Sequence, residues 1–126
     1  MSADTLKRKV IFTIDNKHGV LACGRSDKGD SQLPGYPNYY VGHWLAIDGY
    51  RDYGNIIYIV DPAKSDVIPW SKNISAYYSV PAKKLAKFCE TRGIVYWNYD
   101  RMNSKKWELN NSTFPWRKVL LFCLRE

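Results

Sequence analysis

The sequence predicts an α+β domain, with a twisted, mostly antiparallel sheet of about five strands and one main helix packed against it. Most regular segments are short runs rich in β-branched and aromatic residues, which favour strands. One segment, Pro81–Arg92, has the apolar periodicity of a helix, with Leu85, Phe88 and Cys89 on one face. The sequence has no internal repeat or sign of a second domain, so we expect residues 1–126 to form a single domain.

The first third of the chain is predicted to hold one strand and a long loop. The run Val10-Ile11-Phe12-Thr13-Ile14 favours a strand over Lys9–Ile14. The segment Asp15–Val41 is rich in Gly, Pro, Asn, Asp and Ser, which favours a loop, with a short strand at Val20–Cys23 inside it. A loop of this length in a small domain usually has a function.

Two central strands are predicted next, at His43–Asp48 and Asn55–Val60. Their near-continuous apolar runs indicate burial on both faces of the sheet. An irregular crossing segment, Ala63–Ala76, then leads to the helix, which Pro81 begins and Gly93 ends. The remaining predicted elements are a strand at Ile94–Trp97, a polar connection at Tyr99–Pro115 and a last strand at Lys118–Leu124.

The chain is basic, with a formal net charge of +7. This balance favours polyanionic partners such as nucleic acid or an anionic cell-wall polymer, and a solvated basic surface explains it equally well. The sequence has no apolar run of membrane-spanning length and no signal peptide. We therefore expect no membrane partner, and a protein that is cytoplasmic or is released or delivered without a signal peptide. No cofactor is expected.

The three cysteines are expected to be reduced thiols. Cys23, Cys89 and Cys123 are an odd number without CxxC spacing, which argues against a zinc site and a disulfide framework. Cys23 precedes His43 in a loop-like context and is a candidate nucleophile, because a loop can bring a thiol to a base. Cys89 and Cys123 lie in apolar segments and are expected to be small core residues.

A histidine and a carboxylate on consecutive strands are the main candidates for a functional site. His43 opens the first strand, Asp61 closes the second, and a short Arg51–Asn55 turn joins them. If the two strands pair, His43 and Asp61 lie at the same end of a hairpin. An imidazole beside an orienting carboxylate is two thirds of a catalytic triad.

Seven pieces follow one another in a characteristic order: Val10–Ile14, the Asp15–Val41 loop, Gly42–Tyr50, Ile56–Pro62, Trp70–Tyr78, Pro81–Cys89 and Gly93–Trp97. This order resembles the second half of a papain-type cysteine peptidase domain. It most resembles the bacteriocin-processing-peptidase-like group, which includes phage lysins from actinobacterial hosts. The resemblance covers about residues 9–97 and leaves 98–126 as an extra connection and a last strand.

This resemblance implies a papain-like second half, with His43 as the catalytic base and Asp61 as the orienting carboxylate. In that family the nucleophilic cysteine heads a helix well before the first matched strand, in a Gln…Cys-Gly context. The residues before Val10 contain neither Cys nor Gln.

A second function class needs no cysteine. His18 follows the first predicted strand, so His18 and His43 would flank one cleft if their strands are antiparallel neighbours. Two histidines with a nearby lysine suffice for RNA cleavage without a metal, since one removes the 2′-hydroxyl proton and the other protonates the leaving oxygen. Compact basic domains of this kind occur as toxin modules, for which an inhibitor or immunity protein is the expected partner. His18 is more simply explained as a solvated loop residue.

Aromatic residues in the predicted loops are candidates for substrate binding. The hairpin would place them near His43, where they can line a groove for a peptide, a glycan or a base. The candidates are Tyr36, Tyr39, Tyr40 and Trp70.

Three functions therefore remain open. The first is a papain-like cysteine-peptidase-related domain that hydrolyses peptidoglycan or another peptide with a nucleophile not evident in this chain. The second is a small basic ribonuclease that uses His43 with His18 or Asp61. The third is a catalytically inactive papain-like domain that binds a partner through its aromatic loop. The order of the matched pieces favours the first.

Overall fold

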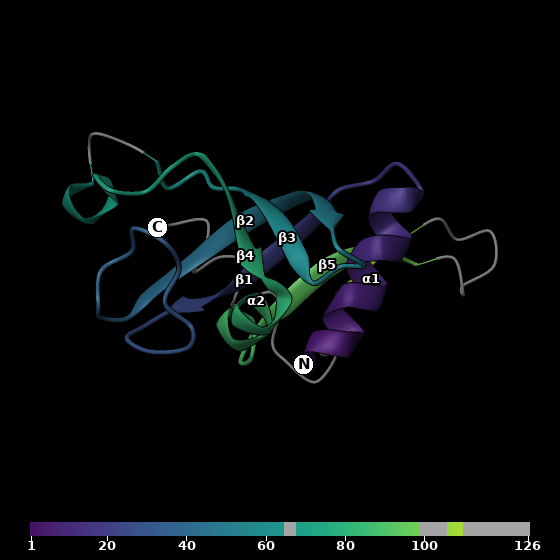
Figure 1. Cartoon of the computed structure of the whole chain (residues 1–126), viewed down its shortest axis with the longest axis horizontal. Helices are drawn as coiled ribbons and strands as arrows, with labels where there is room; N and C mark the ends of the chain where they lie inside the picture. Colours follow the sequence, from purple (N-terminus) through teal and green to yellow (C-terminus); the bar gives the residue numbers. More distant parts are fainter. Residues whose placement is uncertain (65–67, 99–105, 110–126) are drawn as a thin grey trace.

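The computed structural model describes residues 1–64, 68–98 and 106–109, with only the backbone for 97–98 and 106–109. The sheet is six-stranded and antiparallel, in the order β4-β3-β2-β1-β5-β6 (Figure 1). Its elements in chain order are α1 (Ala3–Asp15), β1 (Val20–Ser26), β2 (Val41–Arg51), β3 (Ile56–Val60), a 3₁₀ turn (Pro69–Ser71), β4 (Tyr77–Pro81), α2 (Ala82–Phe88), β5 (Gly93–Asn98) and β6 (Lys106–Leu109). The predicted α+β class is confirmed, with six strands and two α-helices where about five strands and one main helix were expected.

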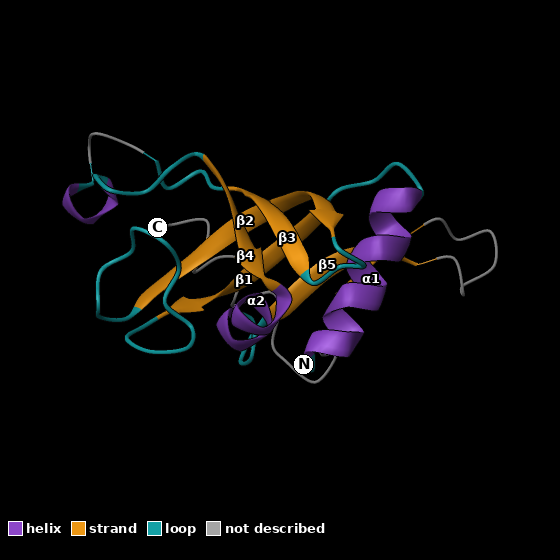
Figure 2. Ribbon diagram, viewed as in Figure 1, coloured by secondary structure: helices purple, strands orange, loops and turns teal. Residues whose placement is uncertain are grey.

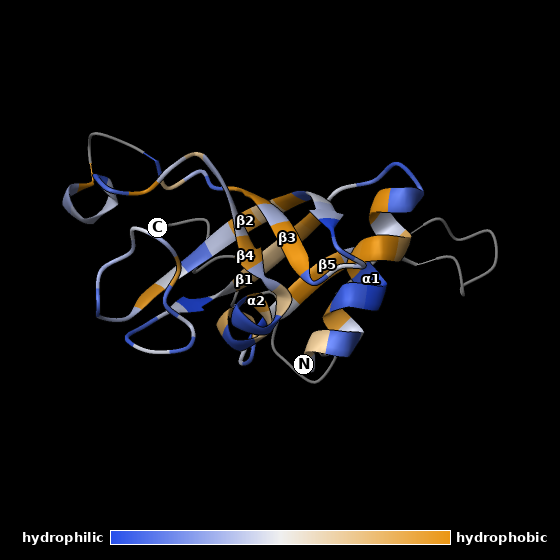
Figure 3. Ribbon diagram, in the orientation of Figure 1, coloured by the Kyte–Doolittle hydropathy of each residue, from blue (hydrophilic) through white to orange (hydrophobic). Residues whose placement is uncertain are grey.

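The first predicted strand is wrong, because residues 9–14 belong to α1. Ser2 caps this helix by accepting a hydrogen bond from the Thr5 amide, 3.1 Å away. Its buried residues, Leu6, Val10 and Thr13, recur at helical spacing. The β-branched run after Val10 favours a strand locally, but tertiary packing overrides such preferences. Figure 3 shows apolar and polar residues alternating along α1.

The long predicted loop contains a central strand of the sheet. β1 pairs with β2 from Val20↔Ile47 to Ser26↔Val41, and with β5 on its other side. The predicted short strand at Val20–Cys23 is therefore confirmed and extends to Ser26. Residues 16–19 and 27–40 remain as connections.

The two predicted central strands form the hairpin β2–β3, but their burial differs from the prediction. Exposure alternates along β3: Ile57 and Ile59 are buried, whereas Tyr58 is 39 % exposed. Burial on both faces is therefore wrong here. A bulge between Ile47 and Gly49 shifts the register of the hairpin by one residue.

Both helices pack on one face of the sheet and form the core with it (Figure 2). Gly24 in β1 allows the end of α2 to approach, because a Cβ there would lie 2.0 Å from the Phe88 carbonyl oxygen. The fully buried residues of this core include Leu6, Val10, Val20, Ala22, Leu45, Ile47, Ile57, Ile59, Leu85, Phe88 and Ile94.

Several boundaries in the second half differ from the predictions. Pro81 is the N-cap of α2, and the helix ends at Phe88, so Cys89 is its C-cap and Gly93 opens β5. Part of the predicted polar connection forms strand β6, which pairs with β5. The predicted last strand, Lys118–Leu124, lies outside the described residues. In the described part of the chain, neither helix is long and apolar enough to cross a membrane.

Candidate active site

The hairpin register brings His43 and Asp61 together. His43 is the third residue of β2, and Asp61 directly follows β3, whose last residue pairs with Ala46. The Nε2 atom of His43 lies 3.5 Å from Oδ1 of Asp61. The His43 side chain is 12 % exposed and that of Asp61 is fully buried. The structure thus has the histidine and carboxylate at one end of the hairpin, as the sequence predicted.

Asp61 accepts hydrogen bonds on both carboxylate oxygens. Its Oδ2 receives the hydroxyls of Tyr36 and Tyr78, each at 2.6 Å, and its Oδ1 receives the Ala63 amide at 2.8 Å. Burial by itself raises the pKa of the Asp61 carboxyl, but the nearby His43 ring and these three donors together hold that pKa below its usual value. Asp61 is therefore ionised at neutral pH.

The same cluster keeps the two tyrosines neutral. Burial raises the pKa of both hydroxyls far above its ordinary value, and the negative charge of Asp61 raises it further. Tyr36 and Tyr78 are thus hydrogen-bond donors at every physiological pH.

His43 has a ring nitrogen available for chemistry. Neither Nδ1 nor Nε2 has a well-formed hydrogen bond within the described residues, and both atoms are buried. The Nε2 side faces the Asp61 carboxylate, which favours the tautomer with the proton on Nε2 and a lone pair on Nδ1. Trp70 contacts the ring edge-on, with centroids 6.2 Å apart, and limits its rotation.

Two connecting segments are packed together over this site. Gly35, with φ of +79°, lies so close to the 68–76 segment that a Cβ would be 2.1 Å from the Asn73 carbonyl oxygen. The next residue, Tyr36, packs against Trp70 with ring centroids 5.8 Å apart. The backbone amide of Asp61 donates to the Ala76 carbonyl at 2.7 Å. Loop 27–40 and segment 68–76 therefore hold the His43–Asp61 pair from two sides.

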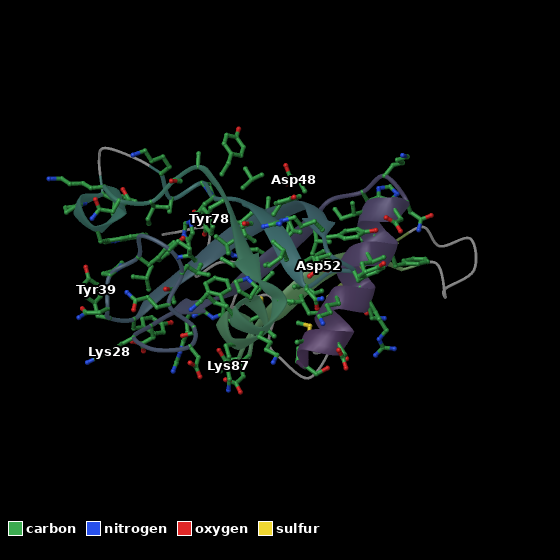
Figure 4. The ribbon with its side chains drawn as sticks, in the orientation of Figure 1. Lys28, Tyr39, Asp48, Asp52, Tyr78 and Lys87 are labelled. Carbon is green, nitrogen blue, oxygen red and sulfur yellow. The ribbon has the colours of Figure 1, made fainter. Side chains whose placement is uncertain are left out.

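An aromatic groove lies beside His43. It has a volume of about 370 Å³ and is lined by Tyr39, Tyr40, Val41, Gly42, Ile68 and Trp70. Three of the four predicted substrate-binding residues thus gather in one groove, and Tyr39 lies at the end of the molecule where β2 begins (Figure 4). The fourth, Tyr36, is buried, packs against Trp70 and donates a hydrogen bond to Asp61. Tyr40 is held by Arg92, whose Nη2 donates to its hydroxyl at 3.0 Å, and by Arg25, which stacks on its ring.

The structure does not bring Cys23 to His43. Cys23 pairs with Trp44 while Gly24 pairs with His43, so the two side chains point to opposite faces of the sheet. The Cys23 sulfur is buried and lies 3.9 Å from Nη1 of Arg92. Cys89 is also buried, and this raises the pKa of its thiol to about 12 despite the nearby N-terminal amine. Cys123 lies outside the described residues.

His18 is also separated from His43. It precedes Val20, which pairs with Ile47, whereas His43 pairs with Gly24. The distance from Val20 to Gly24 along the strand is about 13 Å, and His18 lies beyond it. The predicted cleft depended on a strand at Lys9–Ile14, and this segment is a helix.

Sequence reasoning missed the role of Tyr78, and it assigned Tyr36 to the substrate instead of the carboxylate. Both roles depend on contacts across 17 and 25 residues of sequence, which no local pattern marks. Within the described ranges, no three His, Cys, Asp or Glu side chains gather as a metal site requires.

A comparison with protein-family models matches residues 1–87 to the Peptidase_C39 like family. The chain belongs to this family. The match includes His43, Asp61 and both tyrosines, so the carboxylate–histidine pair lies in a papain-like peptidase domain. No curated protein and no solved structure gives a significant match to the chain.

Proposed function

We propose that this domain supplies the general base and the orienting carboxylate of a papain-like cysteine peptidase. The observation that carries the proposal is the buried His43–Asp61 pair, whose Nδ1 has no hydrogen-bond partner in the described structure. A buried nitrogen without a partner is costly unless another group binds there during function. A cysteine thiol is the group that the family match favours.

The proposed reaction is acyl transfer through the thiol. His43 Nδ1 accepts the thiol proton, and the thiolate attacks the carbonyl carbon of the scissile peptide bond. The imidazolium then gives the same proton to the leaving amine, the C–N bond breaks and a thioester remains. Water, deprotonated by His43, attacks the thioester and releases the carboxylic acid and the thiol. Asp61 keeps the imidazole oriented and stabilises its charged form throughout.

The nucleophile belongs to a cysteine outside the described residues. Cys23 and Cys89 are both buried, and neither is hydrogen-bonded to His43. Cys123 of this chain and cysteines elsewhere in the natural polypeptide that contains it are the candidates. Iodoacetamide labelling followed by mass spectrometry identifies the cysteine whose reactivity depends on His43.

Peptides of an anionic cell-wall polymer are the first substrates to test. The net charge of +7 favours a polyanion, and the aromatic groove beside His43 offers apolar surface to side chains or sugars next to the scissile bond. The proposal includes a relationship to the bacteriocin-processing-peptidase-like group, which contains phage lysins from actinobacterial hosts. The ribonuclease alternative with two histidines has no geometric support, because His18 lies away from His43.

The test uses the longest natural polypeptide that contains this chain, with purified peptidoglycan and a peptide library as substrates. We expect His43→Ala to lower the rate about 10²–10⁴-fold, since it removes the general base. His18→Ala is the matched control and should leave the rate unchanged. Activity retained by the His43 variant would overturn the proposal. So would the absence of both hydrolysis and His43-dependent thiol labelling, an outcome that supports an inactive binding domain.

A further inference from the structure

The hydrogen bonds around Asp61 divide its two oxygens between different tasks. Oδ2 accepts the hydroxyls of Tyr36 and Tyr78, at 2.6 Å each. Oδ1 accepts the Ala63 amide and faces Nε2 of His43. Oxygen–oxygen distances of this length are typical of hydrogen bonds to an ionised carboxylate. Only Oδ1 is thus left to interact with the histidine.

The two hydroxyls come from parts of the chain that are remote in sequence. Tyr36 lies in loop 27–40 and is 4 % exposed, whereas Tyr78 lies in β4 and is partly buried. Together with the Ala63 amide, they restrain the carboxylate against rotation about its Cβ–Cγ bond, because rotation would break short charge-assisted hydrogen bonds. The direction of Oδ1 is therefore determined by two tyrosines that do not touch His43 through any hydrogen bond in the described structure.

This arrangement has a consequence for the histidine tautomer. An ionised carboxylate oxygen can act only as a hydrogen-bond acceptor. When the imidazole is neutral, Oδ1 facing Nε2 therefore selects the tautomer with the proton on Nε2. Nδ1 then carries the lone pair that a general base needs. If Asp61 turned away or took up a proton, the ring proton of His43 would no longer be favoured on Nε2 over Nδ1.

We propose that Tyr36 and Tyr78 are positioning residues of the peptidase reaction, which hold the Asp61 carboxylate ionised and aimed at His43 Nε2. This inference rests on the proposed function for its catalytic meaning, although the hydrogen bonds themselves do not. Tyr36 also packs against Trp70, which lines the aromatic groove. The carboxylate is thus fixed by the same loop that provides groove residues Tyr39 and Tyr40.

A purely structural role for the two tyrosines makes a different prediction. Tyrosines that only fill space could be replaced by phenylalanine without changing how Asp61 titrates. The titratable side chains that face Asp61 are His43 from β2, Tyr36 from loop 27–40 and Tyr78 from β4. A change in its titration can therefore be traced to a small set of neighbours.

The experiment measures the Asp61 carboxyl titration and the His43 ring nitrogens by NMR on this chain, without any turnover. We expect Tyr36→Phe and Tyr78→Phe each to raise the pKa of Asp61 by about one unit or more, a tenfold or larger change in proton affinity. Both variants should also reduce the fraction of His43 with its proton on Nε2. Tyr50→Phe is the matched control, because Tyr50 donates to Asp15 at 2.7 Å on an exposed carboxylate. It should leave Asp61 and His43 unchanged.

An Asp61 titration and a His43 tautomer unchanged in both variants would overturn the inference. If a phenylalanine variant does not fold, a fluorinated tyrosine incorporated at position 36 or 78 keeps the ring and donates more strongly. It should lower the pKa of Asp61, and no change would again refute the role. Failure of the peptidase assay combined with shifted Asp61 titration would reject the proposed function and keep the positioning effect. The opposite pattern would reject the positioning effect alone.

Discussion

Replacing Asp61 by asparagine changes one atom of the side chain and reverses its hydrogen-bond pattern at the centre of the site. The carboxylate of Asp61 accepts from Tyr36, Tyr78 and Ala63 and faces His43. An asparagine amide has the same shape but carries only one acceptor oxygen. Its NH₂ group must therefore face groups that donate to the carboxylate in the wild type.

The lower-energy orientation of the amide can be worked out from the four partners. If the carbonyl oxygen replaces Oδ2, it accepts both tyrosine hydroxyls, and the NH₂ group faces the Ala63 amide and His43. The Ala63 N–H then becomes a buried donor without an acceptor, which costs about 1–3 kcal/mol. In the reverse orientation the hydroxyl oxygens can accept from the NH₂ group, but both tyrosine protons lose their carboxylate acceptor, which costs about twice as much. We expect Asp61→Asn to lower the free energy of unfolding by about 1–3 kcal/mol.

The effect on chemistry should exceed the effect on stability. In the favoured orientation, the NH₂ group donates to Nε2 of His43, which must then carry its proton on Nδ1. The general base is consequently in the wrong tautomer, and in the Ser-His-Asp template the corresponding change lowers the rate about 10⁴-fold. We expect a loss of this order for any thiol-dependent peptidase activity of the polypeptide that contains this chain.

Three measurements check this prediction: urea unfolding at neutral pH, the ¹⁵N shifts of the His43 ring, and peptide hydrolysis. Asp15→Asn is the matched control, because Asp15 also accepts a tyrosine hydroxyl but is exposed, so water can replace the lost bond. An Asp61→Asn variant that keeps the proton of His43 on Nε2 would refute the reasoning. Unchanged stability would refute it as well.

The remaining predictions concern stability and thiol reactivity. Gly35→Ala should lower the free energy of unfolding by about 3 kcal/mol or more, because a positive φ costs about 1–2 kcal/mol and the new Cβ would meet the Asn73 carbonyl oxygen. Gly29 has φ of +106°, and a Cβ added there would have no atom within 4 Å, so Gly29→Ala measures the cost of the positive φ alone. Equal losses of stability in the two variants would contradict the predicted clash at Gly35. Since folding lowers the pKa of Asp61, the stability it provides is fully present above about pH 3.9 and is lost as the pH falls through the folded value. Urea midpoints from about pH 6 to pH 2 should therefore fall more steeply in the wild type than in Asp61→Asn, and parallel curves would argue against this linkage. Cys89, with a thiol pKa of about 12 and full burial, should react with iodoacetamide only as fast as the protein unfolds, and rapid labelling under native conditions would disprove its burial.

The hairpin and its two polar ends could be predicted because the signals are local. An apolar run with a histidine at its start and a carboxylate before Pro62 at the end of the next run are both visible in the sequence. A tight turn between them determines antiparallel pairing, and pairing determines that His43 and Asp61 meet. Here short-range patterns were enough.

The errors arose where tertiary contacts decide the structure. The run after Val10 has the residue types of a strand, but Leu6, Val10 and Thr13 are buried at helical spacing against the sheet. This one error also produced the predicted meeting of His18 and His43. The hydrogen bonds from Tyr36 and Tyr78 to Asp61 depend on how loop 27–40 folds over the sheet and on how β4 pairs with β3, and no local sequence pattern marks either arrangement.

The bulge in β2 gives the two ends of the β2–β3 hairpin different tolerances to insertions and deletions. On the site side of the bulge, β1 holds β2 through seven paired residues, and Ala46 and Ile47 align with Val60 and Ile59. On the turn side, a different register joins β2 to β3. A residue gained or lost near Asp52 can be absorbed where the register already changes, so the spacing between His43 and Asp61 does not depend on the length of the turn. The turn can therefore diverge in sequence and length while the geometry of the His43–Asp61 pair stays the same.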